Sequence, residues 1–500
     1  MPKVTIPNTD SLYHLVCFDE NGNERTDDEQ GKLSEVVLST LTEKPVTDVF
    51  VISHGWKGDI PAAIDQYNLW IKAMADCEID IDRIRMICPE YHPLLIGLHW
   101  PSLPWGNEQL GSQPAESSAV DLGSGNSHQF SADYYPCLMP TDLATEALEI
   151  ILEYERTHAG SKDKPPREIL FACKVLYQES GLIGGGLSAA PGHDHHPFDP
   201  LAFYELIEAQ VPASEIPEFD NQSPNYGDAF ALQAPGWIVS LLQQLSFWKM
   251  KERARNFGQS SGFQLLNQLL AAAPEARFHV MGHSFGCIVA SSVVGGPNGT
   301  GHLVRPVDTL FLVQGALSLW SYAEDIPYGN GGPGYFHPVV KEQKIKGPLV
   351  TTRSKYDSAV GVLYPMASKV SGDACFATAD EPKPPEIGAL GSYGAHGINS
   401  IVVDSPMLPA TRLYRFEPGK IYNLEASQYI SKIENATSGA HNMIAEPEVA
   451  HAFWEAILSV IPGKTSRPQP SLTEPAIPGS NAEPEPVFAT KLHPTETGGC

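Results

Sequence analysis

A serine between two glycines is the first feature of this sequence that could do chemistry. Residues 282–286 read Gly-His-Ser-Phe-Gly, after an apolar run (277–281) and before a run rich in small residues (287–290). This pattern is typical of a strand, a tight turn and a helix, in which the serine is strained and its hydroxyl stands above the sheet edge. The glycines fit because a Cβ at either place would collide with neighbouring backbone. We predict that Ser284 is a nucleophile and that the N–H of Phe285, at the helix start, stabilises an oxyanion.

A serine nucleophile needs a base that takes its proton and a carboxylate that orients the base. In this strand–helix architecture the two groups follow the serine on loops after later strands, in the order acid, then histidine. Asp357 lies just beyond the strand-like run 348–352 and is the predicted acid. Asp404, at the end of the short run 401–403, is the competing candidate. Asp308 is less suitable because it precedes its strand.

The base is expected on a loop near the end of the chain. His441 lies after the last short strand and before the last helix, where a loop histidine can reach back over the sheet edge. His396, in the run Gly-Ala-His-Gly, is the main rival. His451 falls within the final helix, and we interpret it as a surface or packing residue.

A second oxyanion donor should come from the loop after an early buried strand. The β-branched run 46–53 predicts such a strand, and His-Gly-Trp follows it at 54–56. The glycine allows a sharp turn, so the backbone N–H of Trp56 can face the cavity. The alternative is a strand-ending turn with a packed tryptophan.

The elements that must position these residues alternate between strand and helix, which predicts an α/β fold with a mostly parallel central sheet flanked by helices. We expect residues 1–100 to form the first part of this core and 237–461 the second part, with the catalytic residues. Residues 101–236 are rich in Gly, Ser, Pro and His and interrupt the alternation, so we interpret them as an insertion forming a cap or lid. Residues 462–500 are dense in proline and poor in large apolar side chains, which predicts a disordered tail.

Composition excludes several classes of function. The 500 residues carry a formal net charge of −26, and without a basic cluster this argues against nucleic-acid binding. No apolar run reaches membrane-spanning length, so we expect no stable membrane insertion. The eight cysteines are scattered without a C-x-x-C pair, and no secretory signal is visible. We therefore expect a cytoplasmic protein with free thiols.

A His-Asp-His-His cluster at 193–196 has residue types that suit zinc. We favour a solvated polar loop for this cluster, and its possible metal binding stays open. Serine chemistry of the kind predicted here needs neither a metal nor an organic cofactor, and we expect none.

Together, the run 53–56, the run 282–286, Asp357 and His441 resemble the α/β-hydrolase superfamily. The segments 98–106 and 356–361 are also similar to segments of large hydrolase-like proteins of fungi and bacteria. The resemblance implies the α/β-hydrolase fold with a large cap insertion, and esterase- or lipase-like cleavage of a small-molecule or lipid-like ester through an acyl-serine.

Two other functions fit these motifs. One is an acyltransferase on the same fold, in which a bound alcohol or amine replaces water. The other is a non-catalytic hydrolase-like protein whose acidic surface or proline-rich tail binds partners. The acyl group, the alcohol and the oligomeric state are left open by the motifs.

Overall fold

The computed structural model describes most of the chain. The described residues are 3–7, 11–26, 31–56, 60–102, 141–158, 163–210, 237–360, 384–433 and 439–462. The chain divides into two units, Met1–Ile461 and Pro462–Cys500. The predicted disordered tail falls almost entirely outside the described residues.

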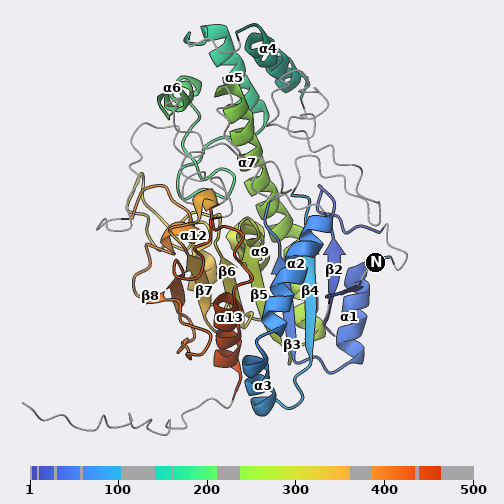
Figure 1. Ribbon diagram of the computed structural model, residues 1–500. Helices are drawn as coiled ribbons and strands as arrows, with labels where there is room; N and C mark the ends of the chain where they lie inside the picture. The colour runs from blue at the N-terminus through green and yellow to red at the C-terminus, as the bar shows by residue number, and fades with distance from the viewer. Residues whose placement is uncertain are drawn as a thin grey trace, which may run out of the picture. The chain divides into compact units, whose positions relative to one another are not determined.

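The described strands form one nine-stranded sheet in the order β1-β2-β4-β3-β5-β6-β7-β9-β8 (Figure 1). All neighbouring strands pair in parallel except β1, which is antiparallel to β2. The predicted α/β class with a mostly parallel sheet is therefore confirmed. The strands are β1 (Lys3–Thr5), β2 (Leu12–Cys17), β3 (Asp48–Ser53), β4 (Pro93–His99), β5 (Arg277–His283), β6 (Thr309–Val313), β7 (Leu349–Arg353), β8 (Val402–Pro406) and β9 (Ile421–Glu425).

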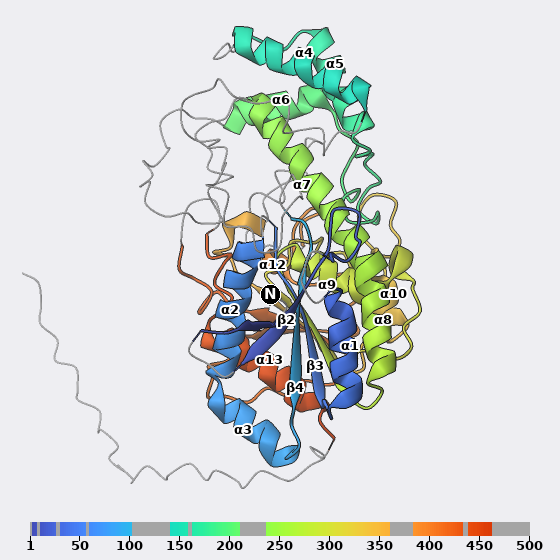
Figure 2. The same ribbon diagram turned by 90° about the vertical axis from the view of Figure 1, so that its right-hand side faces the viewer.

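Helices cover both faces of the sheet, as the edge-on view shows (Figure 2). On one face lie α2 (Ile60–Ala75), α3 (Glu78–Ile87) and α13 (Pro447–Val460). On the other lie α1 (Leu33–Glu43), α8 (Phe263–Ala272), α9 (Gly286–Gly295) and α10 (His337–Lys341). The short helix α12 (Leu390–Tyr393) contacts β7.

Burial on both faces explains the apolar run in β3. Val49 and Val51 belong to the hydrophobic cluster under α1, α8 and α9, whereas Phe50 and Ile52 belong to the cluster under α2 and α13. Successive side chains of a strand point to opposite faces, so a strand covered on both sides needs apolar residues at every position. The central strands are thereby fixed in register, and their carboxyl ends meet at one edge.

The described part of the insertion contains three helices and an irregular stretch, 180–199. It contains α4 (Asp142–His158), α5 (Arg167–Glu179) and α6 (Pro200–Gln210), which precede the long helix α7 (Trp237–Phe257). The run 169–177, which the sequence leaves open between strand and helix, is thus helix. Helix α7 contacts α9 and also α4 and α6, and Figure 1 shows it running from the sheet to these helices.

A π-helical turn (Gly258–Gly262) joins α7 directly to α8. A Cβ at Gly258 would lie 2.6 Å from Ser292 Cβ, so glycine serves there for close packing on α9. In the part of the chain that the structure describes, no helix is long and apolar enough to cross a membrane.

Candidate active site

Ser284 occupies the turn between β5 and α9 with a φ of 56°, a conformation that non-glycine residues rarely adopt. Its N–H donates to the carbonyl of Val313 at 3.1 Å, which fixes the turn against β6. A Cβ on Gly282 would overlap the Gly286 carbonyl, and one on Gly286 would overlap the Ser53 carbonyl. Both glycines are therefore required by close backbone approach, and the side chain of Ser284 is 8% exposed.

The predicted base and acid are in direct contact. His441 Nδ1 lies 2.8 Å from Asp357 Oδ2, and Asp357 is 1% exposed. A backbone bridge between Asp357 and Gly439 holds the two loops together. Since a carboxylate oxygen accepts, the imidazole carries its proton on Nδ1 and keeps Nε2 as the acceptor when neutral.

The loop of His441 also reaches the serine turn. His283 Nε2 donates to the His441 carbonyl at 2.9 Å, and the two rings lie 4.7 Å apart. Ser284 Oγ and His441 Nε2 form no hydrogen bond within the described residues. Asp357 is thus hydrogen-bonded directly to His441. The loop of His441 is hydrogen-bonded to the serine turn through His283, the residue before Ser284.

Gln314 is a site residue that the sequence reasoning missed. It follows β6 directly, has a φ of 47° and is fully buried. Its Nε2 donates at 3.0 Å both to Asp357 Oδ2 and to the Ala440 carbonyl, while its Oε1 has no partner among the described residues. Strain together with an unsatisfied buried oxygen is typical of functional sites. A polar residue directly after a buried strand was the available signal.

The proposed oxyanion donors follow two neighbouring strands of the sheet, β3 and β5. Trp56 follows β3, Phe285 is the N-cap of α9, and their rings stack at 5.3 Å. Phe247 of α7 packs edge-on against both rings. Gly55 permits this approach, since a Cβ there would lie 3.0 Å from Ser284 Cβ. A packed Trp56 ring is therefore compatible with a backbone N–H of Trp56 at the turn, so the oxyanion-donor and packing interpretations of this residue do not exclude each other.

The competing acids and bases have other partners. Asp404 lies on the edge strand β8 and accepts a hydrogen bond from Asn423, whereas Asp308 lies at the amino end of β6 and accepts one from the Phe278 N–H. His396 donates from Nε2 to the Tyr393 carbonyl. Burial lowers the pKa of His396, against smaller opposing effects of that hydrogen bond and of Asp404.

His451 is a buried packing residue on α13. Its Nδ1 lies 2.7 Å from Asp80 Oδ2, and its Nε2 donates to the Arg412 carbonyl at 2.8 Å. Among the described residues, Asp80, His451 and Glu455 are the group whose spacing could hold a metal ion. Arg83 forms ion pairs with both carboxylates, so a cation already lies against this group.

The histidine cluster at 193–196 is not a solvated loop, because Asp194 and His195 are buried. Its members have separate partners: His193 faces Glu252, Asp194 forms a 2.7 Å ion pair with the buried Lys251 of α7, and His196 faces Glu386. This segment therefore anchors the insertion on α7. The polar composition of the cluster did not reveal these distant partners.

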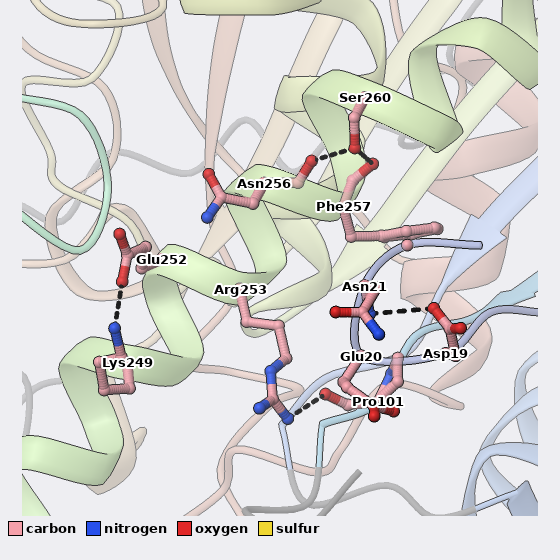
Figure 3. Close-up of a pocket in the computed structure, with 11 residues that line it drawn as sticks. Asp19, Glu20, Asn21, Pro101, Lys249, Glu252, Arg253, Asn256, Phe257 and Ser260 are labelled. Atoms are coloured by element: carbon pink, nitrogen blue, oxygen red, sulfur yellow. Dashed lines mark hydrogen bonds and ion pairs between the residues drawn. The ribbon is translucent and has the colours of Figure 1, made fainter. Parts of the chain in front are cut away.

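A pocket of about 320 Å³ lies along α7. Figure 3 shows Lys249, Glu252 and Arg253 of α7 on one side and the loop after β2 on the other. Arg253 donates to the Pro101 carbonyl at 3.3 Å, and Lys249 pairs with Glu252. Ser284, Asp357 and His441 do not line this pocket.

Comparisons with known proteins give no match: no family model fits the chain, and neither the curated proteins nor the solved structures contain a significant relative.

Proposed function

We propose that this protein is a serine hydrolase of the α/β-hydrolase type that cleaves carboxylic esters through an acyl-serine intermediate. The observation that carries the proposal is the 2.8 Å hydrogen bond between His441 and the buried Asp357. The loop of His441 is held in turn by a hydrogen bond from His283, the residue before Ser284. The φ of 56° at Ser284 and the chain order serine, aspartate, histidine support it. A strained serine, an oriented imidazole and a buried carboxylate are the parts that acyl transfer needs.

In the proposed reaction Ser284 Oγ bonds to the ester carbonyl carbon while His441 Nε2 takes the hydroxyl proton. The carbonyl electron pair moves to its oxygen, and the N–H groups of Phe285 and Trp56 stabilise that oxyanion. Collapse expels the alcohol, which receives the proton from His441, and water then repeats the sequence on the acyl-serine. The serine–histidine hydrogen bond must form on substrate binding, as it often does in active sites that are loosely aligned when empty.

The surroundings of Ser284 favour an apolar substrate group. The rings of Trp56, Phe285 and Phe247 gather beside the serine turn, and Phe247 belongs to α7, which also contacts the insertion. We propose that the insertion is a cap over a small-molecule or lipid-like ester. A cytoplasmic location is part of the proposal, and the five described cysteines, Cys17, Cys77, Cys88, Cys173 and Cys287, are free thiols.

Labelling with a fluorophosphonate probe tests the proposal without knowledge of the substrate. We expect one adduct, mapped by peptide mass analysis to Ser284 and lost in Ser284→Ala and His441→Ala. Turnover of p-nitrophenyl esters of increasing chain length then sizes the acyl pocket, and added alcohols as acceptors separate hydrolysis from acyl transfer. Well-folded parent protein that gives no adduct would reject the enzyme and favour a binding protein.

A further inference from the structure

A continuous row of hydrogen bonds connects the loop that carries Trp56 with the loop that carries His441. Gly55 N–H donates to Gln66 Oε1 at 3.3 Å, and Gln66 Nε2 lies 2.6 Å from His283 Nδ1. His283 Nε2 then lies 2.9 Å from the His441 carbonyl. The row starts beside one proposed oxyanion donor, passes the residue before Ser284 and ends at the proposed base.

The direction of each hydrogen bond in this row is fixed by its ends. The His441 carbonyl can only accept, so His283 carries a proton on Nε2. The Gly55 N–H can only donate, so the amide oxygen of Gln66 faces it and the amide nitrogen faces His283. A neutral His283 with an accepting Nδ1 therefore satisfies all three contacts at once.

The environment of His283 favours this neutral form. The side chain is 3% exposed, and burial, followed by the nearby His441, holds its pKa well below the usual value. The titratable groups that face it are His441 and His54, with no carboxylate among its described neighbours. Gln66, on α2, is half-buried, so its side chain can be changed with less disturbance than that of His283.

We propose that Gln66 and His283 are positioning residues that set the spacing between the oxyanion loop and the base on either side of Ser284. This inference rests on the proposed hydrolase function. Neither residue touches the reacting atoms. They act through the Gly55 N–H and the His441 carbonyl, and they require His283 to be the Nε2–H tautomer.

Two variants of Gln66 test this, with Asp65→Asn as the matched control at the neighbouring exposed position of α2. Gln66→Met removes both hydrogen bonds and keeps the side-chain length. We expect Ser284 labelling by the fluorophosphonate to slow roughly 10- to 100-fold at every pH, the scale of a small misplacement of reacting groups. Gln66→Glu replaces the donor with a carboxylate, so His283 must gain a proton on Nδ1.

Gln66→Glu is therefore expected to show an additional ionisation in the pH profile of labelling that the parent, Gln66→Met and Asp65→Asn lack. NMR of the histidine ring nitrogens should report Nε2–H for His283 in the parent and a protonated Nδ1 in Gln66→Glu. Circular dichroism corrects each rate for the folded fraction. A merely structural role would change that fraction and leave the pH profile unaltered.

The outcomes separate the two claims. If the parent is labelled at Ser284 and both Gln66 variants react at the parent rate and with its pH profile, the positioning role is wrong and the hydrolase stands. If rate losses only follow the lost folded fraction, the positioning role is again wrong. If folded parent protein is never labelled, the hydrolase proposal fails and the positioning role falls with it.

Discussion

Two buried histidine–aspartate pairs in this molecule share nearly the same contact and differ in what the second ring nitrogen meets. His441 Nδ1 lies 2.8 Å from Asp357, and His451 Nδ1 lies 2.7 Å from Asp80. The Nε2 of His451 donates to the Arg412 carbonyl, whereas within the described residues the Nε2 of His441 makes no hydrogen bond. An imidazole with two acceptors holds its proton, and one with a single acceptor can take a proton from elsewhere.

The residues that contact the two carboxylates, Asp80 and Asp357, also differ. Asp80 is paired with Arg83, which also pairs with Glu455, so one cation is shared by two carboxylates within a packed contact between α3 and α13. Asp357 instead accepts a hydrogen bond from the neutral amide of Gln314, and Gln314 follows Val313, whose carbonyl accepts the Ser284 N–H. The comparison teaches that a histidine–aspartate contact alone does not identify a catalytic base. The feature that distinguishes His441 from His451 is a second ring nitrogen that makes no hydrogen bond within the described residues.

The largest expected effect comes from changing each histidine to glutamine. His441→Gln should lower kcat/KM for a p-nitrophenyl ester by roughly 10⁴-fold or more, because the proposed general base is lost. His451→Gln should lower the free energy of unfolding by about 1–3 kcal/mol while each folded molecule still reacts at the parent rate. Ester turnover and guanidinium unfolding measure the two quantities.

Two results would contradict this prediction. Equal losses of turnover per folded molecule in the two variants would mean that His451 is as close to the chemistry as His441, against the arrangement described above. Unchanged turnover in His441→Gln would remove the base from the proposed mechanism.

A smaller effect is expected from Gln314→Met, which removes the amide that holds Asp357 Oδ2 and the Ala440 carbonyl. We expect a loss of roughly 10- to 100-fold in kcat/KM, because Asp357 and the loop of His441 lose their common donor. Gln343→Met is the matched control, since Gln343 is also glutamine at positive φ, 54°, but is exposed. Steady-state kinetics should show the loss in Gln314→Met alone. A similar loss in both variants would assign it to backbone strain.

The strands of this fold were largely predictable because their signals are local. The β-branched run of β3 and the glycine-flanked Ser284 each define their element within a few residues, and both lie where the sequence placed them. The choice of Asp357 and His441 depended on the order of loops after later strands. Their contact in the structure needed the fold, because the two residues are far apart in sequence.

The supporting residues could not be read from the sequence, because their roles arise from contacts between distant segments. Gln66 looks like one polar residue on an amphipathic helix, and only the packing of α2 on the serine turn brings it to His283. Gln314 was passed over as the end of a strand. Likewise, Asp194 was read as part of a polar loop, although its ion pair with Lys251 buries it against α7. Local sequence patterns predict the helices and strands, whereas tertiary contacts determine the partners of these polar side chains.

The smallest expected effect is a pH dependence that sharpens the difference between the two histidines. Burial alone would lower the pKa of His451, but the hydrogen bonds to Asp80 and the Arg412 carbonyl outweigh it and raise that pKa. A group whose pKa is higher in the folded state stabilises fully below its unfolded pKa, about 6.5, and loses this contribution as pH rises through the folded value.

The stability difference between parent and His451→Gln should therefore be largest near pH 5.5, about 1.5–3 kcal/mol for a hydrogen bond to a charged group, and should shrink towards pH 9. Burial lowers the pKa values of His54 and His283, so their contributions to stability change with pH in the opposite direction. Subtracting the unfolding free energy of the variant from that of the parent cancels these contributions. Guanidinium unfolding at a series of pH values measures the difference. A difference that grows with pH would show that His451 is neutral in the folded protein, and its contrast with His441 would then rest on hydrogen-bond geometry without charge.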